Sequence, residues 1–301
     1  MLQIKKYAAI DIGSNAVRLL IANIIEQTGK PTRFKKNSLV RVPIRLGGDV
    51  FMKQEISSEN ITRMVDTMQA FKLLMKSHKV ERYKACATSA MREASNGSEV
   101  AKKILEETEI QIDIIEGEEE AAIIAATDLH SFIDDSKTYL YVDVGGGSTE
   151  FTVIHNGESL ASKSFKIGTV RLLNDIVSKE TWDDLEAWIK LHTANFEKIE
   201  VIGSGGNINK IFKVSGKQLG KPLTYFYLSS YYKMLQTYSY EERITELDLN
   251  QDRADVIIPA TRIYLSAMKW SGAKDIIVPK IGLADGIIKS IYYDTVSSIT
   301  Q

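Results

Sequence analysis

The chain has 301 residues, of which 44% are hydrophobic and 26% are charged, with a net charge of −1; these proportions are typical of a soluble globular protein and leave room for two domains. No apolar run approaches the length that crosses a bilayer, and the N-terminus lacks the apolar core and cleavage site of a signal peptide. The single cysteine, Cys86, excludes an internal disulfide framework and fits a cytoplasmic location, while four scattered histidines argue against a zinc site.

The first half of the chain predicts a strand meander followed by alternating helices and strands. Residues 7–24, YAAIDIGSNAVRLLIANI, indicate a strand that ends near Asp11, a small polar turn and a second strand, and a return strand follows over 33–42. A helix is predicted over 58–78, with Ser58 as its cap and an apolar stripe formed by Ile61, Met64, Val65, Met68, Phe71 and Met75. Then come a strand (82–87), a helix (97–108), a strand (111–115) and a helix (118–129).

The second half repeats this plan. Residues 139–156, YLYVDVGGGSTEFTVIHN, match 7–24 with Asp143 in place of Asp11, and an Asn156-Gly157 turn leads to a return strand through Phe165. The further elements are helical stretches at 169–195, a strand at 199–202, helices from 206 and over 252–271, a strand at 275–278 and a helix from 284. The duplication predicts an α/β protein with two homologous domains, 1–130 and 131–301, the second with an insertion near 214–250.

The charges and the tyrosines are unevenly distributed. Residues 27–48 and 201–240 are basic and contain no acid, which fits either a path for a polyanion or two solvated surfaces. Residues 224–240 of the insertion hold six of the thirteen tyrosines. These tyrosines could stack on a guanine base, form a dimer face or pack onto their own domain.

Three glycine-rich turns follow predicted strands. Such turns expose several backbone N–H groups, which can bind phosphate oxygens, although a single one is also explained as a tight turn. DVGGGSTE is not a Walker P-loop, because no Gly-Lys-Ser/Thr follows, and it is not a dinucleotide fingerprint, because Glu150 replaces the third glycine. The third turn, in VIGSGGNINKIF (201–212), leads into a helix whose dipole favours an anion.

A carboxylate beside bound phosphates requires a cation between them. Mg²⁺, held by few protein oxygens and by the phosphates of the substrate, fits this requirement. Asp143 is therefore the better metal candidate, with Asp11 expected to face it and Glu150 nearby.

The motifs AAIDIGSNAVRLLIA, ACATSAMREASN, IIEGEEEAAI, VDVGGGSTEF, IGTVRL, IGSGGN, RADVIIPA and GLADGI occur in one order along the chain. Over about residues 7–290 the sequence resembles the exopolyphosphatase / guanosine pentaphosphate phosphohydrolase family of the actin-like phosphotransferase superfamily. The resemblance implies two ribonuclease H-like (actin-like ATPase) domains, each with a mixed five-stranded sheet, and an active site in the interdomain cleft. It also implies Mg²⁺-dependent removal of a terminal phosphate from polyphosphate or from guanosine pentaphosphate.

The resemblance further implies a role for individual residues. Glu120 is the base that deprotonates the attacking water; the residues alone leave open which of three consecutive glutamates this is, since only one can point squarely at a cleft. Asp143, Glu150 and Asp11 are the metal candidates. The phosphate-binding candidates are Gly13, Ser14, Asn15, Arg18, Ser89, Arg92, Gly145, Gly146, Gly147, Ser148, Thr149, Arg171, Gly205, Gly206 and Arg253. Arg92, Arg171 and Arg253 are expected as bidentate clamps, with ordinary salt bridges as the alternative.

The chain also departs from the family pattern. Ala16 replaces a usual serine, Ala260 a common glycine and Ala284 a frequent basic residue, and each is expected to weaken a substrate contact. Near residue 301 the chain lacks the helical extension and His-Asp motif of longer members, which puts processive handling of long polymers in doubt.

The expected protein is a homodimeric exopolyphosphatase with polyphosphate preferred over guanosine pentaphosphate. An ATP-dependent actin-like kinase and a non-catalytic sensor of polyphosphate or alarmone are the alternatives. No membrane or specific nucleic-acid partner is expected, because no recognition motif for either is present.

Overall fold

The computed structural model describes residues 1–301 except 126, 128–133, 135, 300 and 301. The chain divides into two compact units, Met1–Thr127 with Leu283–Gln301 and Asp128–Gly282. The predicted limits of 1–130 and 131–301 therefore differ from the observed division at the C-terminal end, where the last helix belongs to the first unit. Within the described part of the chain, no helix combines the length and apolarity needed to span a membrane.

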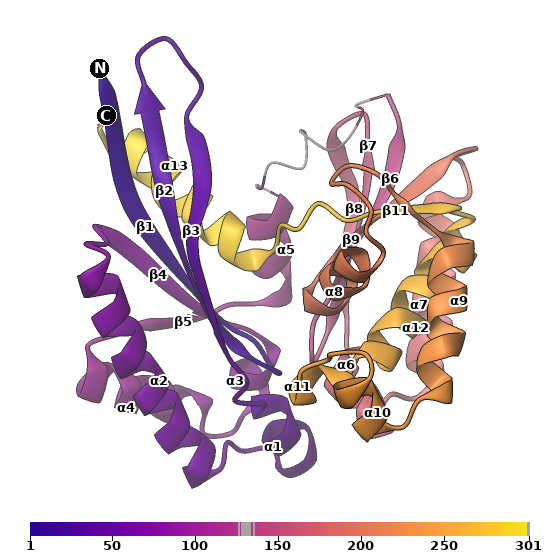
Figure 1. The fold of residues 1–301 in the computed structure, drawn as a ribbon, viewed down its shortest axis with the longest axis horizontal. Coiled ribbons are helices and arrows are strands. Elements are labelled where there is room, and N and C mark those ends of the chain that lie inside the picture. Colours follow the sequence, from indigo (N-terminus) through magenta and orange to yellow (C-terminus); the bar gives the residue numbers. More distant parts are fainter. Residues whose placement is uncertain (126, 128–133, 135, 300–301) are drawn as a thin grey trace. The chain divides into compact units, whose positions relative to one another are not determined.

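The first unit is built on a five-stranded mixed sheet with the strand order β3-β2-β1-β4-β5 (Figure 1). The strands are β1 (Leu2–Ile12), β2 (Val17–Gln27), β3 (Arg33–Val42), β4 (Arg82–Ala87) and β5 (Ile112–Ile114). β1, β2 and β3 form an antiparallel meander, and β4 and β5 continue the sheet in parallel with β1. The helices are α1 (Leu46–Lys53), α2 (Ser58–Ser77), α3 (Ser89–Glu93), α4 (Gly97–Thr108), α5 (Gly117–Ala125) and α13 (Leu283–Ile299).

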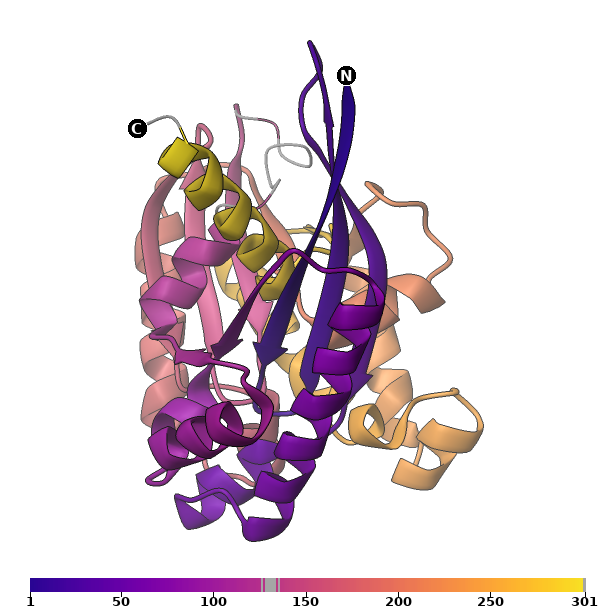
Figure 2. The same ribbon diagram turned by 90° about the vertical axis from the view of Figure 1, so that its left-hand side faces the viewer.

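Helices cover both faces of this sheet. Side chains of β1 alternate, so that Ile10 and Ile12 enter a core with Met64 and Met68 of α2. α13 packs on the opposite face, against β1, β2 and β4, and α5 packs on α13 (Figure 2). This packing explains why α13 belongs to the first unit although it ends the chain.

The predicted stripe of α2 is confirmed, since all its members are buried or packed against the core. The cap is Ser57 rather than Ser58, and its hydroxyl accepts a hydrogen bond from the Asn60 amide at 3.3 Å. The short helices α1 and α3 were not predicted. The predicted helix 118–129 corresponds to α5, and residues 126, 128 and 129 lie outside the described residues.

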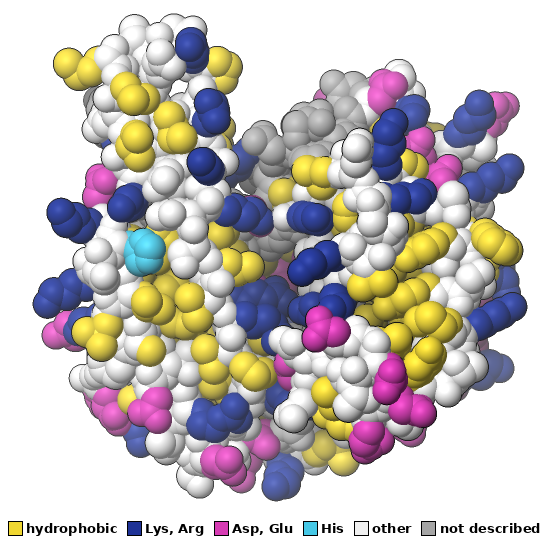
Figure 3. All heavy atoms as spheres, in the orientation of Figure 1, with side chains coloured by type: hydrophobic (Ala, Val, Ile, Leu, Met, Phe, Trp, Pro, Cys, Tyr) yellow, Lys and Arg dark blue, Asp and Glu magenta, His cyan; other side chains and the backbone are white. Residues whose placement is uncertain are grey.

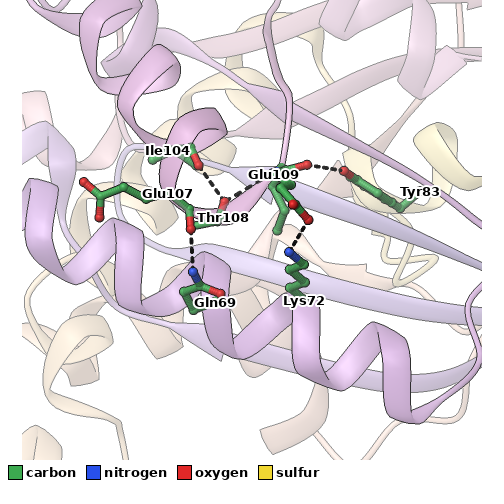
Figure 4. Close-up of polar contacts among 8 residues, drawn as sticks. Gln69, Lys72, Tyr83, Ile104, Glu107, Thr108 and Glu109 are labelled. Atoms are coloured by element: carbon green, nitrogen blue, oxygen red, sulfur yellow. Dashed lines mark hydrogen bonds and ion pairs between the residues drawn. The ribbon is translucent and has the colours of Figure 1, made fainter.

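The end of α4 is fixed to its neighbours by polar contacts (Figure 4). Glu109, which follows α4 with a left-handed φ of 61°, pairs its carboxylate with Lys72 of α2 and accepts a hydrogen bond from the Tyr83 hydroxyl at its carbonyl, at 3.2 Å. Gln69 donates to the Glu107 carbonyl at 2.6 Å. These contacts join α2, α4 and β4 on the side of the unit that does not carry the glycine-rich turn.

The second unit has a six-stranded mixed sheet with the order β10-β11-β9-β6-β7-β8. The strands are β6 (Thr138–Val144), β7 (Thr149–His155), β8 (Glu158–Phe165), β9 (Ile199–Ser204), β10 (Leu223–Thr224) and β11 (Asp275–Ile277). The helices are α6 (Thr169–Leu173), α7 (Lys179–Thr193), α8 (Gly206–Val214), α9 (Tyr225–Thr237), α10 (Tyr240–Thr245), α11 (Gln251–Ala254) and α12 (Ile257–Ser271). The predicted Asn156-Gly157 turn is confirmed, with positive φ at both residues.

The predicted sheet of five strands gains a sixth because the insertion supplies the two-residue strand β10, which pairs antiparallel with β11. The helical stretches predicted at 169–195 are the two helices α6 and α7, and Asp175 adopts a left-handed φ of 53° between them. Within the insertion, Tyr231 is buried in the core of the unit and Tyr227 packs on it. Packing onto its own domain therefore accounts for part of the tyrosine-rich segment, while Phe226 is 80% exposed.

We predict that Gly286→Ala destabilises the first unit by about 1–3 kcal/mol. A Cβ at Gly286 of α13 would lie 2.2 Å from the Ile123 carbonyl oxygen of α5, so the two helices would have to separate. Urea-induced unfolding followed by circular dichroism measures the effect. Gly48→Ala in α1 is the control, because a Cβ there meets nothing within 4 Å; an equal loss of stability in the two variants would contradict the prediction.

Candidate functional site

In the first unit, the turn between β1 and β2 begins at a buried ion pair. Asp11 lies opposite Arg18 in the antiparallel register, and an Asp11 Oδ2 to Arg18 Nη1 distance of 3.0 Å joins them. Burial raises the pKa of the Asp11 carboxyl, and the charge of Arg18 opposes this rise. Asp11 thus has a cationic partner within its own hairpin, and its predicted metal role and the phosphate role of Arg18 stay predictions.

The turn itself is fixed by contacts from distant parts of the chain. The Ser14 and Ser89 hydroxyls lie 2.9 Å apart and both side chains are buried. The amide of Gly47 donates to the Ser14 carbonyl at 2.8 Å, and the amide of Arg45 donates to the Asn15 carbonyl at 3.1 Å. The structure therefore brings together the predicted Ser14, Asn15 and Ser89, and it adds Arg45.

Arg45 is a residue that the motifs did not single out. It precedes α1 with a left-handed φ of 63°, and its backbone amide contacts the turn between β1 and β2. The available signal was its place in the acid-free stretch 27–48, whose lysines and arginines are visible over β3 in Figure 3. One of them, Lys36, is paired with Asp285 of α13 at 2.8 Å.

Arg92 of α3 links two segments of the first unit. Its Nη1 donates to the Ile115 carbonyl at 2.5 Å, and its Nε lies 3.5 Å from a carboxylate oxygen of Glu116. Both partners precede α5 directly. These are the contacts of a residue that fixes the start of α5, which is the structural alternative to the predicted clamp.

α5 carries the three consecutive glutamates and distinguishes among them by burial. Glu118 and Glu119 are exposed, whereas Glu120 is only 9% exposed. Helical geometry separates neighbouring side chains by about 100°, so one member of the run turns inward. Glu120, the residue expected as base, is that member.

In the second unit, two carboxylates lie where the first unit has an ion pair. Asp143 and Glu150 are directly opposite in the β6–β7 register, as Asp11 and Arg18 are in β1–β2. Glu150 is 2% exposed, and its Oε1 accepts hydrogen bonds from Ser148 at 2.7 Å and from Ser164 at 2.9 Å. Like charges directly opposite on adjacent strands destabilise a sheet, so this pair is suited to hold a cation.

The donor set fits a hard divalent ion that retains other ligands. Two carboxylates from one hairpin leave most coordination positions to water and to substrate oxygens, as Mg²⁺ sites do. Consistent with this, the described residues contain no group of three or more His, Cys, Asp or Glu side chains arranged around one point.

The loop between β6 and β7 is held by its carbonyl groups. The amides of Thr169 and Val170 donate to the Gly145 and Gly146 carbonyls at 3.0 and 2.8 Å. The Arg171 Nε donates to the Gly147 carbonyl at 2.7 Å. A Cβ at Gly168 would lie 2.3 Å from the Gly146 oxygen, so only glycine permits this approach.

The fixed carbonyls determine where the amides point. No peptide bond in the described chain is cis, and in a trans peptide the N–H points opposite to the preceding C=O. The amides of Gly146, Gly147 and Ser148 are therefore directed away from α6, side by side. Successive amides in this arrangement form an anion-binding nest. Arg171 binds the loop from the opposite side, through the Gly147 carbonyl.

The third glycine-rich turn, which follows β9, lies against the Asp143 carboxylate. Gly205 has a φ of 119°, and a Cβ there would lie 2.9 Å from the Val144 oxygen and 3.5 Å from Asp143 Oδ1. α8 begins at the next residue, Gly206. The structure thus brings Asp143, Glu150 and the predicted residues Gly145–Thr149, Arg171, Gly205 and Gly206 into one region of the second unit.

Arg253 and the three alanines complete the predicted set. Arg253 lies half-buried on α11 in the second unit. Ala16 and Ala284 are buried in the first unit, and Ala260 is fully buried in the core of the second. Ala260 was expected to weaken a substrate contact, but its methyl group packs in the hydrophobic core.

We predict that Arg18→Met makes stability depend more strongly on pH. Loss of the guanidinium raises the pKa of Asp11 further above its ordinary value of 3.8. A raised pKa in the folded state means that stability is fully present below the unfolded pKa and is lost as the pH rises. The free energy of unfolding should therefore fall by about 2–3 kcal/mol at pH 7 and far less at pH 4.

Denaturant unfolding of Arg18→Met between pH 4 and 8 measures this dependence. The double variant Asp11→Asn/Arg18→Met is the control. Neither of the two positions then carries a charge, so the added pH dependence should disappear. A single variant whose pH profile parallels that of the wild type would contradict the prediction.

Comparison with known proteins places the chain among phosphatases. The description "Ppx/GppA phosphatase family" belongs to a family profile that matches residues 38–294. A protein of Haemophilus influenzae named putative exopolyphosphatase is 24% identical over 96% of this chain and 92% of its own length. A bifunctional 3-dehydroquinate synthase/phosphatase of Fusobacterium nucleatum is 36% identical over 55% of this chain, and a guanosine-5′-triphosphate,3′-diphosphate pyrophosphatase of Photobacterium profundum is 32% identical over 56%. The chain spans only 25% and 32% of these two longer proteins.

Solved structures agree with this placement. The crystal structure of the Aquifex aeolicus member of the Ppx/GppA family superposes with a TM-score of 0.74 and 25% identity, over 97% of this chain and 99% of that one. An exopolyphosphatase from Cytophaga hutchinsonii superposes with a TM-score of 0.82 and 22% identity, over 95% and 97% of the two chains, which shows the same fold. The predicted two-unit α/β fold is thereby confirmed. From the match over most of its length, the chain belongs to the Ppx/GppA phosphatase family.

Proposed function

We propose that this protein is an exopolyphosphatase, which hydrolyses the terminal phosphate of inorganic polyphosphate. The observation that carries the proposal is the glycine loop of the second unit, whose carbonyls are held by α6 and Arg171 while its amides are directed to the other side. This nest adjoins two facing carboxylates. Guanosine pentaphosphate is the second candidate substrate, because relatives are named for a guanosine phosphate as well as for polyphosphate.

Asp143 and Glu150 are proposed to hold Mg²⁺. The ion neutralises charge on the phosphate chain when bound, which is a principal requirement of phosphoryl transfer. The amides of the loop from Gly145 to Ser148 bind phosphate oxygens and orient the terminal group. Ser14, Asn15 and Ser89 of the first unit are proposed to bind phosphate oxygens.

Glu120 is proposed to be the general base. Its carboxylate takes a proton from water as the water oxygen bonds to the terminal phosphorus, and the bond from that phosphorus to the bridging oxygen breaks. Orthophosphate and a polyphosphate shorter by one unit are the products. The low exposure of Glu120 supports this role, because it is the one glutamate of the run 118–120 that turns inward. A magnesium requirement, a homodimer and a cytoplasmic location remain predictions from the sequence.

We predict that Glu120→Gln lowers phosphate release by about 10²- to 10⁴-fold, the usual contribution of a general base, while polyphosphate binding is retained. Phosphate release should be measured from short polyphosphate, long polyphosphate and guanosine pentaphosphate, with and without Mg²⁺. Glu118→Gln and Glu119→Gln, on the exposed side of α5, are the matched controls and should keep near-normal rates. Unchanged release by Glu120→Gln would contradict the assignment of the base, and ATP consumption that depends on an acceptor would favour a kinase instead.

We predict that Glu150→Gln weakens the binding of Mg²⁺ without preventing the chain from folding. The amide oxygen can still accept the hydrogen bonds from Ser148 and Ser164, but half of the facing charge is lost. Mg²⁺ should therefore bind about 10- to 100-fold more weakly, and the thermal stabilisation that Mg²⁺ gives the wild type should shrink accordingly.

Calorimetric titration with Mg²⁺ and thermal unfolding with and without the ion measure both effects. Glu158→Gln, an exposed carboxylate at the start of β8, is the control. Equal Mg²⁺ affinity in Glu150→Gln and Glu158→Gln would remove Glu150 from the metal site.

A further inference from the structure

Tyr264 of α12 is a buried tyrosine whose hydroxyl contacts the turn that follows β9 in the second unit. Its side chain has no exposed area, and its hydroxyl donates a hydrogen bond to the Ser204 carbonyl. Ser204 ends β9 and lies beside Asp143 in the parallel β6–β9 register. The phenol therefore binds the residue at which β9, the neighbour of the strand that carries Asp143, leads into the third glycine turn.

The same hydroxyl meets Gly205. A Cβ at Gly205 would lie 3.0 Å from the Tyr264 oxygen and 2.9 Å from the Val144 oxygen. The Val144 carbonyl and the phenol thus both occupy the space that a side chain at Gly205 would need, and the turn is packed closely against the two.

The Tyr264 hydroxyl is the donor of this hydrogen bond, because a carbonyl oxygen can only accept. An apolar ring at the same place would leave the Ser204 carbonyl without this donor in a dry interior, where lost hydrogen bonds are costly.

We propose that Tyr264 is a positioning residue, whose hydroxyl fixes the turn after β9 against the end of β6 and so sets the distance between Asp143 and the phosphate-binding amides. The effect of Tyr264 on catalysis rests on the proposed function. The positioning of the turn, by contrast, is a property of the folded chain alone. Tyr264 does not contact substrate; it acts through Ser204 and Gly205.

The test compares Tyr264→Phe with Tyr231→Phe. Both variants remove one hydroxyl from a buried tyrosine of the second unit, and Tyr231 lies on α9, where its ring stacks on that of Tyr227 at 6.2 Å. Backbone amide hydrogen exchange, resolved by peptide or by residue, is measured on each full chain. Tyr264→Phe should accelerate exchange about tenfold in residues 144–148 and 203–207 and much less in the rest of the second unit. Its melting temperature should lie below that of Tyr231→Phe, because the variant leaves the buried Ser204 carbonyl without its donor.

Activity on polyphosphate gives the second readout. In Tyr264→Phe, the Mg²⁺ concentration for half-maximal phosphate release should rise several-fold, and kcat/KM should fall about tenfold, while Tyr231→Phe behaves as the wild type. Unchanged exchange in the two loops would overturn the proposal. An exchange increase spread evenly over the unit would also overturn it, since that is the result of a general loss of stability.

The two proposals fail in different ways. If the wild-type chain released no phosphate from any polyphosphate, the proposed function would be wrong, but the exchange experiment would still decide the role of Tyr264. If the wild type were active and the loops of Tyr264→Phe exchanged normally, only the positioning role would be lost.

Discussion

The orientation of three peptide groups determines what the second unit can bind. The carbonyls of Gly145, Gly146 and Gly147 are all taken by donors of the segment that begins α6, and planar trans peptides leave the following amides no other direction than away from it. The close approach requires glycine at position 168, because a Cβ there would lie 2.3 Å from the Gly146 oxygen. The proposed anion site of this unit therefore rests on the backbone amides of the β6–β7 loop.

The duplication shows how one position in a hairpin can change the chemistry of a fold. Both hairpins place an aspartate at the end of the first strand, but its cross-strand neighbour is Arg18 in the first unit and Glu150 in the second. The first pair neutralises itself, and the second concentrates negative charge. The proposed metal site therefore lies in only one of two otherwise similar hairpins.

The sequence predicted what depends on local patterns. The stripe of α2, the Asn156-Gly157 hairpin and the order of strands were all visible in residue spacing, and the glycine loops were visible as motifs. It could not predict contacts that tertiary packing creates. Examples are the approach of Ser14 to Ser89, the burial of Glu120 alone among three consecutive glutamates, and the contact of the Tyr264 hydroxyl with the turn that follows β9. The short helices α1 and α3 escaped for the same reason, because their few residues carry no period of their own.

The helix α13 packs across the sheet of the first unit although it is made last. During synthesis on the ribosome, residues 1–127 emerge with one face of their sheet lacking the helix that will cover it, and they must wait until all of 128–282 has been translated. The second unit, by contrast, is continuous in sequence and has its whole core available as soon as it leaves the exit tunnel. The first unit is thus completed by a segment that is translated after the whole of the second unit.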